Sequence, residues 1–249
     1  MNLSHYTVEG ITNRLTSGAV GVIVPLGATE QHGPHLPLGV DSMIAAALAV
    51  GVAERLGDAG HVSVIAPVLP FGDSSHHISF PGSTSLRHEV LAGVLHDLCD
   101  SFLQASFAWV ALVTGHAGNC AAMREVAAHH DPGSVISVDD WPSIRAAIHG
   151  VASTRLGLST DYVGTHAGHF ETSIMLHLHP ELVQMDRAEA GAIGDPKVLG
   201  ARLRSEGMPA VSENGVIGDP TKADAAAGYQ YLDAMVRYNS SAIHERLAS

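Results

Sequence analysis

Short apolar runs alternate with longer amphipathic segments along this chain, and this alternation limits the possible folds more than any other feature. Runs rich in β-branched residues are typical of buried strands and occur at 19–27, 61–72, 109–119 and 134–141. Segments with helical spacing of apolar residues lie at 41–57, 85–104, 120–130, 171–180 and 225–249. Strands that alternate with helices predict one mostly parallel sheet, covered by helices on both faces. We therefore expect a single α/β domain over residues 1–249.

Three loops carry acids and histidines, and two of these loops directly follow a predicted strand. The residues concerned are Glu30, His32, Asp41, His116, His166 and Glu171. In parallel sheets ligands bind beyond the carboxyl ends of the strands, so these side chains are expected on the side where chemistry occurs. Carboxylates and imidazoles together suit Zn²⁺, Mn²⁺ or Fe²⁺. The three loops therefore predict a divalent-metal site, and an acid that bridges two ions would make it a two-metal centre.

Each loop also has a simpler structural explanation. Asp41 is well placed to cap the helix expected after it, and Glu30 and His32 are suited to hydrogen bonding within their loop. His116 lies in a glycine turn, where a histidine is commonly structural. His35 is expected to have a structural role rather than to bind a metal. The combination of three loops, none of which contains cysteine, favours a catalytic metal site over these explanations and over a structural zinc site.

Charge and composition exclude several functional classes. The net charge of −12 would repel polyanions, so nucleic acids and anionic membrane surfaces are not expected partners. No apolar run approaches the roughly 18–20 residues that a membrane span requires. The first residues lack the basic-then-apolar order of a signal peptide, which favours the cytoplasm. The two cysteines, Cys99 and Cys120, have no metal-binding spacing and are expected to be buried, reduced thiols.

Five motifs of the chain resemble the successive signatures of the creatininase family of metal-dependent amidohydrolases. They are PLGATEQHGPHLPLGVD, FGDSSHHISFPGSTSL, TGHAGN, THAGHFETS and GVIGDPTKADAAAG. The first motif is highly specific, whereas TGHAGN alone is weak. The resemblance implies a creatininase-like α/β fold, two divalent ions per chain (Zn, Mn or Fe) and assembly into homo-oligomers, often hexamers. It further implies that a metal-bound hydroxide attacks the carbonyl group of an amide-type C–N bond.

The resemblance assigns four of the ligand-type residues to the two ions. It implies that Glu30 and His116 hold one ion and that His32 holds the other. It implies that the Asp41 carboxylate bridges the two ions.

One position departs from the creatinine-hydrolysing members of the family. Those members have a glutamate two residues after the histidine that corresponds to His116, and this glutamate completes the ligand set of the second ion. Here that position is Gly118. Glu171 is the candidate to replace the missing ligand.

For the reaction itself, the resemblance implies that His166 transfers protons. Glu171 is a second catalytic candidate, and His169 is the next candidate proton donor. Ser74 matches a substrate-contacting serine of the family. The other two substrate-binding candidates are His77 and Asn119.

The expected substrate is a small-molecule amide or a short peptide. The glycine at position 118 is shared by formylaminopyrimidine deformylases and by the peptidases that trim the mycofactocin precursor, and HAGHFETS is most similar to the latter. Creatinine, or another cyclic amide or formamide, is the alternative. A non-catalytic metal-binding scaffold is disfavoured by the presence of His166. A phosphoesterase would need Arg or Lys near the site, and the three ligand-bearing loops contain neither.

Overall fold

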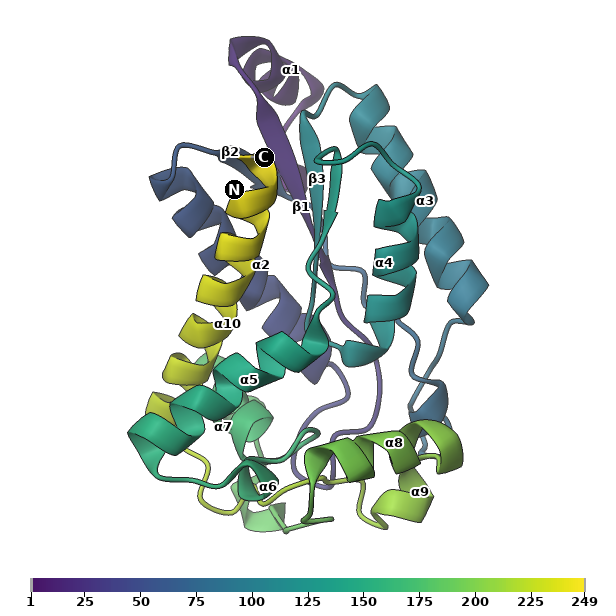
Figure 1. Ribbon diagram of the computed structural model, residues 1–249, viewed down its shortest axis with the longest axis vertical. Helices are drawn as coiled ribbons and strands as arrows, with labels where there is room; N and C mark the ends of the chain where they lie inside the picture. The colour runs from purple at the N-terminus through teal and green to yellow at the C-terminus, as the bar shows by residue number, and fades with distance from the viewer. Residues whose placement is uncertain (1, 249) are drawn as a thin grey trace.

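A parallel sheet of four strands runs through the centre of the computed structural model, in which residues 2–248 are described (Figure 1). The strands are β1 (Val20–Leu26), β2 (Val62–Ile65), β3 (Trp109–Thr114) and β4 (Val135–Ser137). Their order across the sheet is β2-β1-β3-β4, so β1 and β3 form its centre. In the register, Val22 of β1 lies opposite Val64 on one side and Val110 on the other. The predicted parallel sheet is confirmed.

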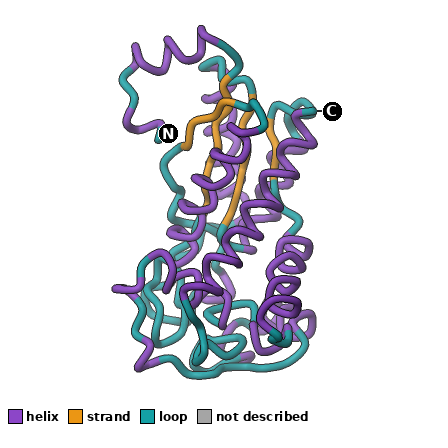
Figure 2. Tube along the Cα trace, turned by 90° about the vertical axis from the view of Figure 1, so that its left-hand side faces the viewer, coloured by secondary structure: helices purple, strands orange, loops and turns teal. Residues whose placement is uncertain are grey.

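Helices cover both faces of this sheet (Figures 1 and 2). One face packs against α2 (Val40–Asp58), α5 (Trp141–Val151), α7 (His169–Leu178) and α10 (Ala225–Leu247). The other face packs against α1 (Val8–Ser17), α3 (His88–Gln104) and α4 (Cys120–Ala128). Side chains of a strand point alternately to opposite faces. Accordingly, Ile23 enters the first core and its neighbours Val22 and Val24 enter the second.

Shorter elements gather beyond the carboxyl ends of the strands, at the lower end of Figure 1. The helices there are α6 (Thr160–Val163), α8 (Pro196–Glu206) and α9 (Met208–Val211). Short 3-10 or π turns occur at Leu3–His5, Ser75–His77, Ala117–Asn119, Ala152–Leu156, Pro180–Leu182 and Met185–Arg187. Among the described residues, no helix has the length and apolar character needed to cross a membrane.

All four predicted strands are shorter in the structure, and the runs 61–72 and 134–141 lose the largest share of their length. The run 61–72 forms a strand only over Val62–Ile65, and beyond it Leu69, between Pro67 and Pro70, makes a single bridge to Leu26. The run 134–141 pairs only over Val135–Ser137. It ends before Asp140, whose side chain accepts a hydrogen bond from the Ser143 N–H and so starts α5.

Candidate metal centre and active site

The predicted ligand residues meet where β1 and β3 end. Glu30 and His32 lie in the loop after β1, and His116 lies two residues after the end of β3. Asp41 belongs to the first turn of α2, whose N-cap is Gly39, so it does not cap the helix as the structural explanation proposed. Gly115 lets α2 approach β3, because a Cβ at this position would lie 2.3 Å from the Asp41 carbonyl oxygen. The loops and the helix start thus converge on one buried point.

Asp41 lies between two histidines at this point. Its Oδ1 is 3.3 Å from His32 Nε2, and its Oδ2 is 3.2 Å from His116 Nδ1. Glu30 Oε1 lies 3.5 Å from His116 Nδ1, and Glu171 Oε2 lies 3.9 Å from His32 Nε2. Two groups of side chains with metal-ligand geometry result, and both contain Asp41. One consists of Glu30, Asp41 and His116, and the other of His32, Asp41 and Glu171.

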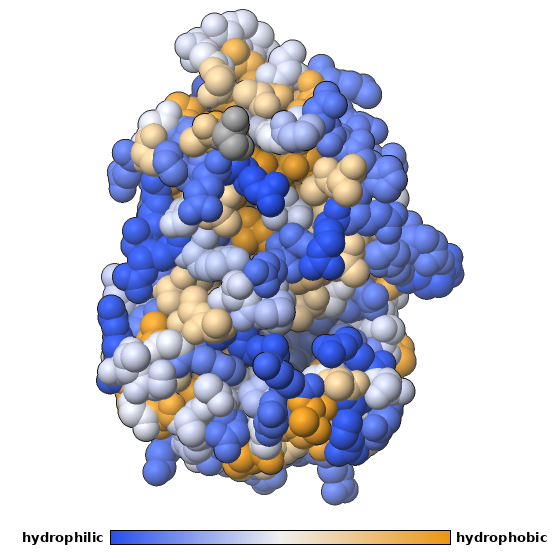
Figure 3. All heavy atoms as spheres, in the orientation of Figure 1, coloured by the Kyte–Doolittle hydropathy of each residue, from blue (hydrophilic) through white to orange (hydrophobic). Residues whose placement is uncertain are grey.

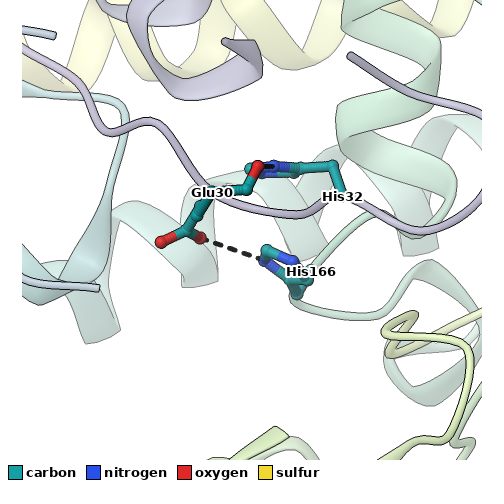
Figure 4. A group of neighbouring side chains, drawn as sticks. All are labelled: Glu30, His32 and His166. Atoms are coloured by element: carbon teal, nitrogen blue, oxygen red, sulfur yellow. Dashed lines mark hydrogen bonds and ion pairs between the residues drawn. The ribbon is translucent and has the colours of Figure 1, made fainter. Parts of the chain in front are cut away.

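A third group joins His166 to the two residues of the first motif. The ligand-type atoms of Glu30, His32 and His166 all lie within 4.8 Å of one another. Figure 4 shows the His166 ring directed at the Glu30 carboxylate, and His166 Nδ1 is 3.7 Å from Glu30 Oε1. His166 therefore has the position of a group that acts at the cluster, either on a substrate or on a metal.

Buried polar atoms that lack a hydrogen bond test whether this cluster is suited to bind a metal ion. Among the described residues, no hydrogen bond is found for Glu30 Oε2, His32 Nε2 or Asp41 Oδ2, although each is buried, and the latter two have only ion-pair contacts, at 3.3 and 3.2 Å. Buried polar atoms nearly always have partners because leaving one unpaired costs about 1–3 kcal/mol. These atoms are carboxylate oxygens and an imidazole nitrogen, the donors that suit Zn²⁺, Mn²⁺ and Fe²⁺. The residues present therefore fit divalent cations.

The pKa values of the cluster residues show which of them carry a proton when no cation is bound. Burial disfavours the charged form of His32, but Asp41, Glu171 and Glu30 outweigh it and raise the His32 pKa to about 9. Burial also disfavours the charged form of His116, but Glu30 and Asp41 outweigh this effect and raise the pKa of His116 to about 10. Burial raises the pKa of Glu30 to about 7 against the opposing effect of His116. The cluster thus holds protons at neutral pH in the places where a metal would bind.

Glu171 enters the cluster from the first turn of α7, and its role as the replacement ligand stays a prediction. Its Oε2 also accepts a hydrogen bond from the Ala167 N–H, which fixes the side chain from behind. Ala167 has a φ of 51°, an unusual backbone conformation for a residue with a side chain. Burial raises the pKa of Glu171 to about 7, although His32 opposes this effect.

The position of the missing glutamate has no room for a side chain. A Cβ at Gly118 would lie 2.0 Å from the Asp73 carbonyl oxygen and 2.4 Å from His116 Nε2. That same carbonyl accepts a hydrogen bond from His116 Nε2 at 2.8 Å, which leaves Nδ1 to face Asp41. Main chain from the Asp73 loop therefore fills the space beside Gly118. Sequence reasoning missed Asp73 because its contribution comes from the backbone.

The three predicted substrate contacts lie in different surroundings. Ser74 is fully buried beside Glu30, whose charged form its hydroxyl favours, but its Oγ makes no hydrogen bond of good geometry among the described residues. His77 is also buried, with Nε2 3.3 Å from Glu30 Oε1. The Asn119 amide donates to the Gly27 carbonyl and accepts from the Asp73 N–H, so it joins two loops. Its expected contact with substrate stays a prediction.

Two other histidines of the motifs point away from the cluster. His169 contacts the Tyr231 hydroxyl through Nδ1 and the Lys222 carbonyl through Nε2, at 3.1 and 3.2 Å. With both ring nitrogens occupied, His169 has a structural place in the fold. His35 lies 2.8 Å from Thr172 Oγ1 through Nε2, in agreement with its expected structural role.

A cavity of about 580 Å³ opens beside the cluster, between the start of α4, the start of α5 and α8. Figure 3 shows the surface hollowed there, below α5. Its lining includes Gly118, Trp141, Arg204 and His76. The His76 ring stacks on the His116 ring with centroids 6.0 Å apart. None of the ligand-type residues lines the cavity, and His76 and Gly118 lie between it and His116.

Comparison with known proteins establishes the family. The sequence profile described as creatinine amidohydrolase matches residues 4–243. The chain belongs to the creatininase family. The mycofactocin precursor peptide peptidase of Mycolicibacterium smegmatis is 36% identical over 219 residues, which cover 86% of this chain and 81% of that protein. The creatinine amidohydrolase of Pseudomonas putida is 31% identical over 191 residues, which cover 70% of each chain.

Solved creatininase structures confirm the fold of this family member. A crystal structure of creatinine amidohydrolase has a TM-score of 0.76 at 26% identity and covers 99% of this chain and 98% of that one. Two further creatininase structures are described as a Zn–Zn type and as a Mn form, with TM-scores of 0.76 and 0.75 and identities of 27% and 26%. Each of the two covers 99% of this chain and 98% of its own. The predicted fold and the prediction of a creatininase-family amidohydrolase are confirmed.

Proposed function

We propose that this amidohydrolase uses two divalent metal ions to cleave an amide bond in a short peptide. One observation carries the proposal: two groups of buried ligand-type side chains share the carboxylate of Asp41. Glu30 and His116 would hold one ion, and His32 and Glu171 the other. Ions bound in this way lower the pKa of water and polarise a carbonyl group. Zn²⁺, Mn²⁺ and Fe²⁺ are the candidates, in keeping with the mixed donor set.

His166 supplies the proton transfer in this proposal. Burial, followed by the charge of His32, holds the pKa of His166 well below its usual value, so its ring is neutral and one of its nitrogens carries a lone pair. Amide hydrolysis needs a group that takes the proton of the attacking water and returns it to the leaving nitrogen. His166 Nδ1 faces the cluster at Glu30, which is the place for that group.

Ser74 is the proposed hydrogen-bond donor to the substrate. Its hydroxyl is buried next to the cluster and makes no hydrogen bond of good geometry among the described residues. A buried hydroxyl without a partner is unfavourable, so it is suited to a bound polar group. A substrate carbonyl oxygen at this place would accept its hydrogen bond.

A peptide substrate is supported by the relatives. The cavity beside His116, of about 580 Å³, lies within the range of ligand sites. The mycofactocin precursor peptide peptidases share more of their sequence with this chain than the creatinine amidohydrolase of Pseudomonas putida does. Gly118, in a place without room for a glutamate, separates this site from that of the creatinine-hydrolysing members. Homo-oligomeric assembly and a cytoplasmic location stay predictions.

A direct assay separates the two candidate substrates. The metal-loaded protein is incubated with a mycofactocin precursor peptide or with creatinine, and products are followed by mass spectrometry. We expect cleavage of the peptide at one amide bond and little conversion of creatinine. Rapid conversion of creatinine with an intact peptide would reverse the assignment. Turnover of neither would limit the proposal to another amide.

A further inference from the structure

The side chain of Gln31 lies between His77 and His166, two of the histidines that lie within 4 Å of the Glu30 carboxylate. Its amide nitrogen is 2.9 Å from His77 Nδ1, 2.9 Å from His166 Nε2 and 3.1 Å from the Gly215 carbonyl oxygen. Its amide oxygen accepts a hydrogen bond from the Gly33 N–H at 2.9 Å, which fixes the orientation of the amide. Gln31 is buried, so these contacts replace water around its side chain.

The hydrogen atoms of these groups have one consistent arrangement. The amide nitrogen has two hydrogens for three contacts, and the Gly215 carbonyl, which only accepts, takes one. The main-chain carbonyl of Gln31 lies 2.8 Å from His166 Nε2 and also only accepts, so His166 Nε2 carries a hydrogen. That nitrogen is therefore no acceptor for the amide. The second amide hydrogen goes to His77 Nδ1.

We propose that Gln31 is a positioning residue that sets the tautomers of His77 and His166. With its Nδ1 accepting from the Gln31 amide, His77 carries its hydrogen on Nε2, which lies 3.3 Å from Glu30 Oε1. With its Nε2 donating to the Gln31 main chain, His166 presents a lone pair on Nδ1 to the cluster. Hydrogen bonds of this kind decide which histidine nitrogen is available and orient the carboxylates that bind metals.

The groups around Gln31 suit an amide side chain and not a carboxylate. Gly215 has a φ of 78°, and a Cβ there would lie 2.0 Å from Gln31 Oε1, so the chain closes directly on this side chain. A glutamate has the same shape but only accepts hydrogen bonds. It would leave the Gly215 carbonyl without a donor and would require a hydrogen on His77 Nδ1.

The consequence of these tautomers for catalysis rests on the proposed function. In that function His166 Nδ1 is the proton acceptor, and the His77 Nε2–H group orients the Glu30 carboxylate. The tautomers themselves do not rest on that function. They are measured without substrate and without metal, so a failure of the tautomer assignment is distinguishable from a failure of the amidohydrolase mechanism.

The test is ¹⁵N NMR of the histidine ring nitrogens in the metal-free protein, in solution or in microcrystals. His77→Gln and His166→Gln identify the two rings through the signals that each variant loses. In the natural sequence we expect both rings to carry hydrogen on Nε2 and not on Nδ1. In Gln31→Glu we expect His77 to carry hydrogen on Nδ1. His166 stays unchanged there, since its partner is a main-chain carbonyl.

Gln104→Glu is the matched control, because Gln104 is exposed on α3 and should leave both rings unchanged. A hydrogen on Nδ1 in place of Nε2 of either ring in the natural sequence overturns the proposal. An unchanged His77 in a folded Gln31→Glu variant overturns it as well. If that variant does not fold, the tautomers of the natural sequence decide the question alone.

Discussion

The two carboxylate oxygens of Asp41 face different histidines: Oδ1 lies 3.3 Å from His32 Nε2, and Oδ2 lies 3.2 Å from His116 Nδ1. Burial disfavours the charged form of Asp41, but the two histidines outweigh it and hold the pKa of Asp41 well below its usual value. Asp41 is therefore a carboxylate at every pH at which the protein is expected to work. A carboxylate that bridges two cations must stay charged and must direct its two oxygens to different ligand groups, and Asp41 meets both requirements.

Removal of the Asp41 charge should release both ions. In Asp41→Asn each proposed ion loses a shared ligand, and the negative charge between two cations disappears. In His32→Ala only one group of ligands is incomplete, so one ion should stay bound. Elemental analysis measures the metal content of both purified variants. Asp58→Asn, on the exposed end of α2, is the control for the loss of a negative charge. Equal, partial loss of metal from the two site variants would show that Asp41 does not bridge.

Metal binding should release protons and should strengthen as the pH rises. His32 and His116, with pKa values of about 9 and 10, are protonated at neutral pH, and a histidine binds metal only as the neutral ring. Both pKa values are raised above 6.5, so the competing protons are lost as the pH rises toward 9 and 10. Calorimetry in two buffers with different ionisation enthalpies counts the released protons. Heats that do not depend on the buffer would contradict this electrostatic account.

His166→Gln separates proton transfer from metal binding. If His166 moves protons, the variant should keep its metal content and lose about 10²–10⁴-fold in the single-turnover rate. If His166 is a ligand, as its place beside Glu30 and His32 also allows, metal and rate should fall together. His179→Gln, outside the cluster, is the control for loss of an imidazole. A normal rate with full metal would remove His166 from the mechanism.

Gly118→Ala should destabilise the fold. The new Cβ would meet the Asp73 carbonyl oxygen at 2.0 Å, and overpacking of this kind costs about 1–3 kcal/mol. Gly93→Ala is the matched control, because a Cβ there meets nothing within 4 Å and alanine favours the α3 helix by up to about 1 kcal/mol. Denaturant unfolding measures both changes. Equal free energies of unfolding for Gly118→Ala and Gly93→Ala would mean that the Asp73 loop moves to accommodate the added methyl group.

The strands and most of the ligand residues were predictable from the sequence because both depend on local patterns. β1 and β3 read as apolar runs, and the acids and histidines follow them directly. The pattern does not predict helix α5, because the apolar run 134–141 indicates a strand through Trp141, although Asp140 and Pro142 are typical of a helix start.

The arrangement around the ligands was not predictable in the same way. Gln31 bonds to groups at positions 77, 166 and 215, and no local pattern signals a contact over such separations. The loss of space at Gly118 depends on a main-chain carbonyl of the Asp73 loop. Tertiary packing alone decides both features.

An anomalous difference map from crystals of the zinc-loaded protein tests the central claim most directly. We expect about two peaks per chain, as in two-metal hydrolases, one on each side of the Asp41 carboxylate. Glu30 and His116 should contact one peak, and His32 and Glu171 the other. A single peak, or two peaks that do not share Asp41, would contradict the account.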